Sequence, residues 1–438
     1  MQLSVIGCGY LGAVHAVAMA ELGHRVTGVD VDSDKIAQLS AGTAPFFEPE
    51  LDRRLVAALA SGRLLFTTDI STVQQASVHI IAVGTPQQRE GSAADLTQID
   101  RAVGALIPHL KSGDIVVGKS TVPVGTAAAL AARMASTGAT LVWNPEFLRE
   151  GWALKDTIEP DRIVLGVSPE VGDAEQRAIS TLKHVYQSAV ARNTPVIVTD
   201  WATAELIKGA ANAFLATKIS FINAMAEVAE AAGADVTQLA EAIGHDNRIG
   251  HRFLGAGIGF GGGCLPKDIR AFTAMAEGLG QGESVEFLRE VDAINLRRRD
   301  RAVDLVAQSV GPDLRGKKVA VLGAAFKPNS DDVRDSPALD VARRLYERGA
   351  QVTVTDPAAL PHARVAYPQL GYSEDVDTTL RGADAVILAT EWDEYRRDLS
   401  PDHAASLVRN RMIVDGRNCL DPEAWRDAGW SYQGMGRR

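Results

Sequence analysis

One cysteine of this chain lies in a setting that favours reactivity. Cys264 occurs in GFGGGCLPKD, residues 259–268, behind a run of glycines and close before a lysine and an aspartate. A lone cysteine is most often an inert packing residue. A glycine loop gives little apolar cover, however, and a cation such as Lys267 lowers the pKa of a nearby thiol. We therefore predict that Cys264 is a nucleophile.

A second set of polar residues lies in a long apolar segment. Residues 201–232, WATAELIKGAANAFLATKISFINAMAEVAEAA, contain no proline and predict one helix, apolar on more than one side, that packs between domains or against another subunit. Lys208 and Asn212 are four residues apart, so they share a helix face within reach of one ligand. A buried lysine needs a counter-charge or a substrate oxyanion. Glu205, one turn earlier, offers a simple ion pair as the alternative.

Two glutamates follow a short apolar run. NPEFLREG contains Glu146 and Glu150, and each is either a general base or a surface charge. Their spacing leaves both interpretations open.

The first thirty residues predict a dinucleotide site. GCGYLG, from Gly7 to Gly12, follows an apolar run and opens a helical stretch, and Asp30 closes the next strand. The glycines admit a pyrophosphate at the helix N-terminus, and the acid accepts hydrogen bonds from ribose hydroxyls. The alternative is a glycine turn needed only for packing. An acid at this position favours NAD over NADP because it repels a 2′-phosphate, and we interpret Cys8 as structural.

NAD and a reactive thiol together suggest one chemistry. The thiol adds to an aldehyde, and the resulting hemithioacetal gives up a hydride to become a thioester. The sequence therefore points to oxidation of an aldehyde carbon.

The remaining chain repeats the strand and helix pattern. The apolar runs VHIIAVGTP, DIVVGKSTVP and TLVWNPEF alternate with alanine-rich helical segments, as in a parallel sheet with covering helices. The pattern restarts at Lys317 with a degenerate glycine turn and a strand that ends in Asp356. We predict an α/β fold of two Rossmann-like doubly wound domains joined by a long central helix. The expected divisions are residues 1–195 for the NAD-binding domain, 196–300 for a helical connector and dimerisation domain, and 315–438 for the second Rossmann-like domain, with a site in the cleft between the two.

A basic cluster, NLRRRDR at residues 295–301, is expected near a helix end. Such a run is usually a solvated face. We assign it no function.

Composition limits the class of protein. The 438 residues carry a formal net charge of -10, which disfavours nonspecific binding to nucleic acid or anionic membranes. The chain shows neither a long uncharged apolar stretch nor a signal-peptide pattern, so we expect a cytoplasmic protein with no membrane partner. Three widely spaced cysteines suggest neither a disulfide framework nor a zinc knuckle, and we expect no metal site.

The motifs together resemble a known family. GCGYLG, STVPVGT, NPEFLREG, ELIKGAANAFLATKISFIN, DNRIGHRFLGAGIGFGGGCLPKD and FKPNSDDVRDSP occur in the order and spacing of the UDP-glucose/GDP-mannose dehydrogenase family. The resemblance covers nearly the whole chain and is closest to the bacterial UDP-glucose 6-dehydrogenase branch. It implies NAD-dependent four-electron oxidation of UDP-glucose to UDP-glucuronate through a cysteine thiohemiacetal and thioester. It also implies that residues 315–438 bind the UDP-sugar and that the protein is a homodimer.

The resemblance assigns catalytic roles residue by residue. Cys264 resembles the nucleophile, and Asp268 the residue that positions it and water. Lys208, with Asn212 beside it, resembles the group that stabilises the alkoxide. Thr121 is similar to the residue that orders water or nicotinamide, and Glu150 to the base that activates water.

The resemblance also implies two sets of ligand contacts. Arg248 is similar to an arginine that reaches the substrate of the neighbouring subunit, and Arg417 is either a nucleotide contact or a solvated surface residue. The implied NAD contacts are Gly7, Gly9, Tyr10, Leu11, Gly12, Asp30, Lys35, Thr85, Thr121, Glu150, Lys267 and Arg334. The implied substrate contacts are Phe147, Leu148, Arg149, Glu150, Gly151, Lys208, Asn212, Arg248, Phe253, Leu254, Gly255, Ala256, Gly257, Gly261 and Lys327.

Two other functions remain open at this point. One keeps the chemistry and changes the sugar nucleotide to UDP-N-acetylmannosamine or GDP-mannose. The other, more distant, is a non-enzymatic nucleotide-sensing protein that retains the fold, although the cysteine, lysine, asparagine and acids that the chemistry needs are all present.

Overall fold

The computed structural model describes residues 1–88 and 91–437. The chain forms two compact units. Unit 1 contains residues 1–211 and 270–279, and unit 2 contains residues 212–269 and the chain from residue 280 onward. Helix α9 (Trp201–Ala232) begins in unit 1 and ends in unit 2, whereas α11 (Leu265–Gly278) begins in unit 2 and ends in unit 1. The three-part division expected from the sequence stays a prediction.

Unit 1 is built on a sheet of eight strands in the order β3-β2-β1-β4-β5-β6-β7-β8. The first six strands are parallel and follow the strand order typical of dinucleotide-binding folds. β7 is antiparallel to β6, and β8 is parallel to β7. The strands are β1 Gln2–Ile6, β2 Arg25–Val29, β3 Leu64–Thr67, β4 Val78–Ile81, β5 Ile115–Gly118, β6 Thr140–Trp143, β7 Ile163–Val167 and β8 Val196–Asp200.

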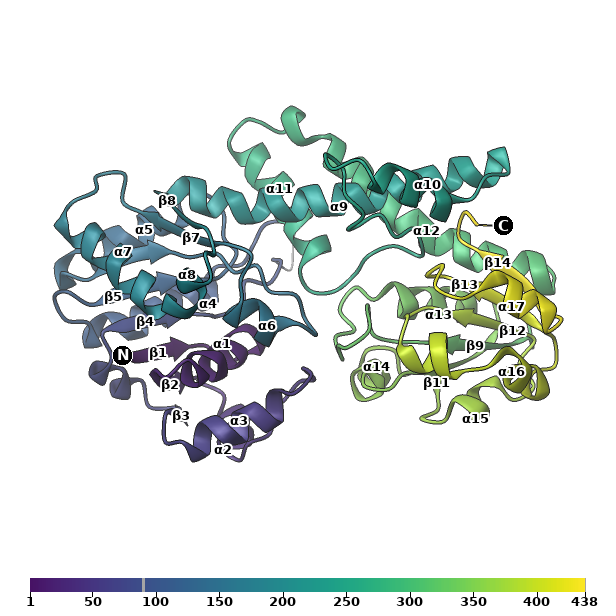
Figure 1. Cartoon of the computed structure of the whole chain (residues 1–438), viewed down its shortest axis with the longest axis horizontal. Coiled ribbons are helices and arrows are strands. Elements are labelled where there is room, and N and C mark those ends of the chain that lie inside the picture. Colours follow the sequence, from purple (N-terminus) through teal and green to yellow (C-terminus); the bar gives the residue numbers. More distant parts are fainter. Residues whose placement is uncertain (89–90, 438) are drawn as a thin grey trace. The chain divides into compact units, whose positions relative to one another are not determined.

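Helices flank this sheet, which is why its central strands β4 and β5 are buried along their whole length (Figure 1). The α-helices of unit 1 are α1 Tyr10–Glu21, α2 Ser33–Ser40, α3 Leu51–Ala60, α4 Thr97–Leu106, α5 Thr126–Met134, α6 Ala153–Ile158, α7 Asp173–Val185 and α8 Gln187–Ala191. The short 3-10 helices are η1 Ile70–Gln75, η2 Ile107–His109 and η3 Ala135–Thr137.

Unit 2 contains a parallel sheet of six strands in the order β11-β10-β9-β12-β13-β14. The strands are β9 Lys318–Leu322, β10 Gln351–Thr355, β11 Gly371–Tyr372, β12 Ala385–Leu388, β13 Met412–Asp415 and β14 Ser431–Gly434. Its helices are α10 Val236–Gly244, α12 Phe287–Val310, α13 Pro337–Glu347, α14 Leu360–Ala366, α15 Val376–Leu380, α16 Pro401–Leu407 and α17 Pro422–Asp427, with the short turns η4 Glu283–Val285 and η5 Glu394–Asp398. The first six strands of unit 1 and the six strands of unit 2 have the same order, which confirms the predicted fold class.

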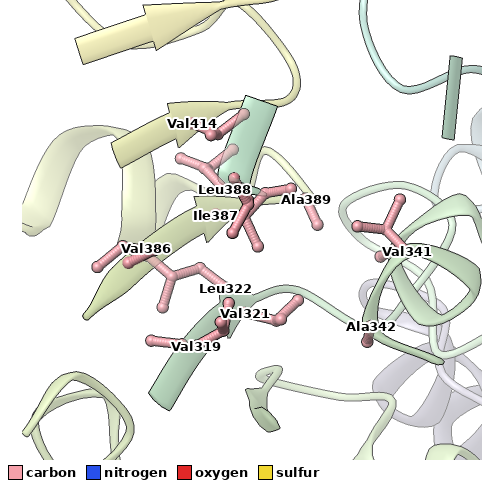
Figure 2. Packing of buried hydrophobic residues seen from close by; sticks show 14 of the residues in the cluster. Val319, Val321, Leu322, Val341, Ala342, Val386, Ile387, Leu388, Ala389 and Val414 are labelled. Atoms are coloured by element: carbon pink, nitrogen blue, oxygen red, sulfur yellow. The ribbon is translucent and has the colours of Figure 1, made fainter. Parts of the chain in front are cut away.

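The core of unit 2 forms where β9 lies between its two neighbours. Val321 is in register with Val354 of β10 and with Ile387 of β12, and all three side chains are buried. Figure 2 shows these layers of valine, leucine and isoleucine from β9, β12 and β13 beside helix α13. Burial of such side chains is the main favourable term in folding.

The predicted long helix is confirmed, since α9 covers residues 201–232. Its one interior glycine, Gly209, is required by packing in unit 1, because a side chain there would overlap the ring of Phe272. Among residues 1–88 and 91–437, no helix combines the length and apolarity that a membrane span needs.

The expectation for the basic cluster at residues 295–301 is wrong. The cluster lies within α12 rather than near a helix end, and the side chains of Arg298 and Arg299 are buried at 0% and 3% exposure. Asn295 is also fully buried. The three share one helix face because they are spaced i, i+3 and i+4.

Candidate active site

The glycine turn after β1 has the geometry of a dinucleotide fingerprint. Gly7 has a φ of +91°, and a Cβ there would lie 2.7 Å from the side chain of Val83. A Cβ on Gly12 would overlap the carbonyl oxygen of Gly7, so this glycine allows the helix to pack on the strand. Gly9, at the N-cap of α1, faces open space. Close packing therefore explains why Gly7 and Gly12 are glycines. The open space at Gly9 leaves room for a pyrophosphate to approach the N-terminus of α1.

Asp30 follows β2 and joins this turn. Its carboxylate accepts hydrogen bonds from the N–H of Cys8 at 2.7 Å and of Asp32 at 3.0 Å, and its Oδ2 lies 3.0 Å from Lys35 Nζ. Asp30 and Lys35, both expected at the cofactor, therefore lie together beside the glycine turn. Elsewhere in unit 1, Thr85 donates from its hydroxyl to the carbonyl of Thr121 at 2.8 Å, which brings two more of the expected residues together.

The equivalent acid of the second sheet is fully used by the protein. Oδ2 of Asp356 accepts from the N–H groups of Ala324 and Ala325, at 2.7 and 2.9 Å, and from Trp392 Nε1 at 3.1 Å. Its Oδ1 accepts two more backbone N–H groups. A carboxylate with five donors has little capacity left for a ribose, so the degenerate fingerprint of unit 2 lacks the acid function of unit 1.

Lys208 has a carboxylate partner other than the expected one. In unit 1 its Nζ lies 3.0 Å from Glu146 Oε1, and both side chains are largely buried. Glu205 instead accepts the N–H groups of Gly125 and Ala127, at 2.7 and 2.6 Å, and so caps α5. Glu146 is therefore paired with the lysine and is not a solvated surface charge. Its role as a general base stays a prediction.

A second buried lysine lies near Glu146. Lys119 donates to Asn144 Oδ1 at 2.9 Å, and burial lowers its pKa to about 8 despite the opposing charge of Glu146. Lys119, Asn144 and Glu146 line a small cavity of about 50 Å³ together with the ring of Phe147. Nothing in the local sequence marks Lys119 as buried, although it stands directly before the expected STVPVGT motif.

Glu48 links the glycine turn to the NPEFLREG segment. Its carboxylate accepts from the hydroxyl of Tyr10, from Gly151 N–H at 2.7 Å and from Ala153 N–H at 2.8 Å. Tyr10 and Gly151, expected on cofactor and substrate respectively, thus meet on one buried acid. Burial raises the pKa of Glu48, and these hydrogen bonds oppose that rise. An acid within FFEPEL had given no signal by type or spacing.

In unit 2, Cys264 lies directly before α11 and its side chain is exposed. Its carbonyl accepts the N–H of Asp268 at 2.8 Å, which closes the first helical turn. The buried carboxylate of Asp268 accepts from Asn212 Nδ2 at 2.6 Å and lies 2.7 Å from Lys267 Nζ. The N-terminus of a helix and a nearby cation both favour a thiolate. Four of the expected residues are therefore brought together.

The glycines before Cys264 are required by a neighbouring protein segment, residues 326–337. A Cβ on Gly261 would overlap the carbonyl of Asp335, and one on Gly262 would lie 2.7 Å from the ring of Phe326. The N–H groups of Gly262 and Gly263 donate to this segment, at 2.9 Å to the carbonyl of Arg334 and 3.3 Å to the carboxylate of Asp332. Close packing of two backbones explains these glycines.

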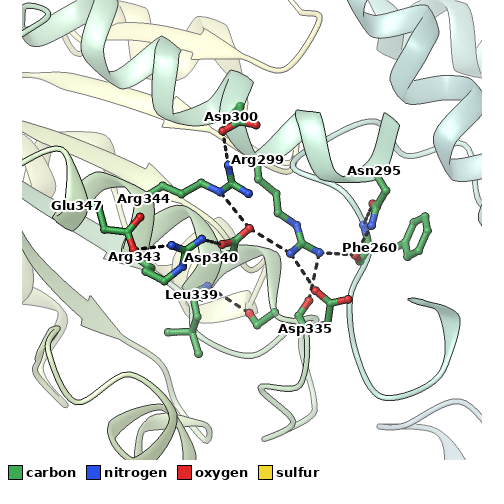
Figure 3. Close-up of polar contacts among 11 residues, drawn as sticks. Phe260, Asn295, Arg299, Asp300, Asp335, Leu339, Asp340, Arg343, Arg344 and Glu347 are labelled. Carbon is green, nitrogen blue, oxygen red and sulfur yellow. Dashed lines mark hydrogen bonds and ion pairs between the residues drawn. The ribbon is translucent and has the colours of Figure 1, made fainter. Parts of the chain in front are cut away.

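Helix α12 anchors the other side of the glycine loop. Asn295 accepts the N–H of Phe260 at 2.7 Å and donates to its carbonyl at 3.0 Å. Arg299 donates to Asp335 at 2.9 Å and to Asp340 at 3.2 Å, and it also donates to the carbonyl of Phe260 (Figure 3). Arg298 donates to the carbonyl of Gly257 at 3.2 Å. The cluster that received no function thus holds the loop in place.

Arg417 also serves this loop. Its guanidinium donates to three carbonyl oxygens, those of Ala389 and Gly259 at 2.8 Å and of Phe326 at 3.1 Å. The solvated-surface alternative for Arg417 is therefore wrong. Its donors are directed at backbone, so the residue fastens strand ends to the glycine loop.

The other residues expected to contact the substrate differ in their exposure and in their partners within the protein. Leu254 and Ala256 are buried in a cluster with α9, which leaves only their backbone for a ligand. Phe253 has a left-handed φ of +65°. Arg248 is 89% exposed and pairs with Asp246. In unit 2, Lys327 lies over the ring of Phe326, and Arg334 pairs with Asp332. In unit 1, Arg149 donates to Asp156 through two nitrogens. The ring of Phe147 lies against the guanidinium of Arg162.

Comparison with protein families agrees with these elements along the chain. Residues 1–190 match the NAD binding domain of the UDP-glucose/GDP-mannose dehydrogenase family, residues 202–297 its central domain, and residues 320–422 its UDP binding domain. The chain belongs to this family. The resemblance inferred from the motifs is thereby confirmed.

Individual relatives are similar over their full length. The UDP-glucose 6-dehydrogenase of Rhizobium meliloti is 41% identical, with all of both chains covered, and a UDP-glucose 6-dehydrogenase of Bacillus subtilis is 38% identical, with 100% of this chain and 98% of that one covered. A UDP-glucose dehydrogenase structure from Pyrobaculum islandicum superposes with a TM-score of 0.89 at 41% identity, covering 100% of this chain and 98% of that one. A UDP-D-ManNAc dehydrogenase from Pyrococcus horikoshii gives 0.85 at 26% identity, covering 100% and 99%.

NAD is the cofactor of this dehydrogenase, as predicted. The residues present fit the dinucleotide, because Gly9 leaves the N-terminus of α1 open and Asp30 stands at the end of β2. Asp356 is already saturated, so the fingerprint of unit 1 is the better fit.

We predict that Gly262→Ala destabilises the protein. The φ of +85° and the ring of Phe326 both oppose a side chain there, with an expected cost of about 1–3 kcal/mol. Thermal unfolding of the variant measures the effect. Gly255→Ala is the matched control, because a Cβ there meets open space. Equal midpoints for both variants would contradict the packing explanation.

We predict that Glu48→Gln loosens the NPEFLREG segment without disturbing the rest of unit 1. In the variant one carboxylate oxygen is replaced by an NH₂ group, which cannot accept a hydrogen bond from a backbone N–H. Hydrogen exchange at Gly151 and Ala153 should therefore accelerate. Glu205→Gln is the reciprocal control, and it should accelerate exchange at Gly125 and Ala127 alone. Unchanged exchange at residues 151 and 153 in Glu48→Gln would refute the assigned link.

Proposed function

We propose that this chain oxidises the primary alcohol of UDP-glucose to the carboxylate of UDP-glucuronate, and that Cys264 carries the intermediates. One observation supports this most directly. Cys264 opens α11 one turn before Asp268, whose carboxylate binds Asn212, and Asn212 lies one turn along α9 from Lys208. A thiol, a cation and an acid are the groups that this oxidation needs.

The reaction balances with two equivalents of NAD, each of which accepts one hydride when bound. The alcohol loses a hydride and a proton and becomes an aldehyde. The thiolate of Cys264 adds to the aldehyde carbon, and the thiohemiacetal so formed loses a second hydride to give a thioester. Water adds to the thioester, the carbon–sulfur bond breaks, and the carboxylate leaves with the thiol restored.

Lys208 is the group that we propose to stabilise the oxygen that becomes negative in these steps. A correctly placed donor of this kind typically contributes about 3–4 kcal/mol of transition-state stabilisation. Glu146, at 3.0 Å, places a negative charge beside the buried lysine. Because Glu146 has this task, we assign activation of water to Glu150, and ordering of water or nicotinamide to Thr121.

Asn212 and Asp268 are proposed to position the thiol. Their hydrogen bond at 2.6 Å joins α9 to the first turn of α11, and Lys267 adds a positive charge beside that turn. We also retain as proposals the contacts that the family resemblance implies for the sugar nucleotide and NAD.

We infer that the chain works as a homodimer. Phe214, Phe221 and Val228 on α9 are 67%, 49% and 58% exposed and recur every seven residues. An apolar stripe of that period is typical of a helix that packs against another helix. The same stripe on a second copy of the chain would bury it. We also propose a cytoplasmic location, because a thiol nucleophile must remain reduced.

The substrate is tested with a panel of UDP-glucose, UDP-N-acetylmannosamine and GDP-mannose. We predict two NADH and one carboxylate per UDP-glucose for the unmodified protein. Cys264→Ser should form carboxylate much more slowly than the unmodified protein does, and it should accumulate aldehyde or a stalled adduct. Cys419→Ser is the control, since burial raises the pKa of that thiol and it should leave the stoichiometry unchanged. Normal carboxylate formation by Cys264→Ser would refute the thioester route.

The dimer is tested by the mass in solution. We predict that the unmodified chain has twice the monomer mass in light scattering, and that Phe221→Glu is mainly monomeric because a buried charge at the stripe is costly. Val365→Glu replaces another exposed apolar residue of unit 2, on α14, and should remain dimeric. A monomeric unmodified chain would contradict the proposal.

A further inference from the structure

Two histidines and a glutamate converge at the end of α10, on either side of the turn that carries Arg248. Glu241 lies on the helix, and His245 follows its last residue, Gly244. Residues 246–250 turn the chain back, so that His251 returns to the same helix end. A Cβ on Gly244 would overlap the His251 ring, so this glycine makes the approach possible.

The donor atoms lie close enough together for one small metal ion to draw them into its coordination shell. Glu241 Oε1 lies 3.1 Å from His245 Nε2, and Glu241 Oε2 lies 3.4 Å from His251 Nδ1. One donor atom from each of the three residues lies within 4.8 Å of the others. Zinc binds nitrogen and oxygen at about 2.0–2.1 Å, which places tetrahedral ligands about 3.3 Å apart.

The local structure holds these side chains before any ion arrives. The two imidazole rings pack edge to face, with centroids 4.8 Å apart at 87°. Lys218 Nζ donates to the carbonyls of Ile249 at 2.9 Å and Gly250 at 3.3 Å, which fixes the turn that delivers His251. The three side chains are 49–71% exposed, so an ion can enter and keep water as a further ligand.

We propose that Glu241, His245 and His251 form a binding site for a divalent transition metal of the zinc type. Two imidazoles and one carboxylate suit zinc, cobalt and nickel, and they disfavour calcium and magnesium, which prefer oxygen ligands. The bound ion joins the end of α10 to the chain that leads into residues 253–257. This site goes beyond the proposed oxidation and does not depend on it.

The experiment measures zinc and cobalt binding to the full chain without a histidine tag, freed of metal by a chelator that is then removed. Calorimetry gives the stoichiometry and affinity for zinc, and visible absorption of bound cobalt reports its ligand geometry. Cys264→Ser serves as the background, because an exposed thiol also binds zinc. The same titrations are run on His251→Ala and Glu241→Gln in that background.

We expect one ion per chain, a raised thermal midpoint with zinc, and affinity weakened at least about tenfold by each of the two variants. His403→Ala is the matched control, since His403 lies 2.8 Å from Asp377 and, in the described part of the chain, belongs to no group of three such donors. It should bind as the background does. Absence of binding, or equal affinity in His251→Ala and the background, would overturn the proposal.

Discussion

The site in unit 2 depends on close packing of one backbone against another. The glycine loop before Cys264 has residues 326–337 on one side and the inner face of α12 on the other, and these neighbours leave no room for a side chain at Gly259, Gly261 or Gly262. Because both sides are fixed by hydrogen bonds to backbone groups, the loop has one path. That path delivers Cys264 to the first turn of α11, where helix geometry favours the thiolate.

Buried carboxylates form a second layer of organisation, and each is committed to particular donors. Glu48 gathers Tyr10 and Gly151, Glu146 meets Lys208, and Asp268 holds Asn212. A buried charge is tolerated only with such partners, so each acid specifies the positions of the groups around it. The polar residues of the site are in this way positioned by ionic and hydrogen-bonded contacts, whereas the sheets beneath them are held by apolar packing.

The two sheets show how one topology serves different ends. The first six strands of unit 1 have the same order as the six strands of unit 2, and each sheet places an aspartate after its second strand in sequence. Asp30 meets the glycine turn and a lysine, whereas Asp356 is saturated by four backbone N–H groups and an indole. The fold alone therefore does not assign a ligand, and the donors around the acid distinguish the two.

The sequence by itself determined the elements and the family. Apolar runs, glycine turns and the long uninterrupted segment at residues 201–232 are local signals, and each predicted an element that the structure contains, including α9 to the residue. Ordered motifs further identified the chemistry-bearing residues. Local signals did not predict the partners of these residues, because the partners come from distant positions in the chain. Lys208 pairs with Glu146, and Glu48 joins two motifs. Asn295, Arg298 and Arg299 are buried in a cluster that was expected to be solvated. Only the tertiary structure decided these, since burial and hydrogen-bond pairing arise when segments far apart in the chain pack together.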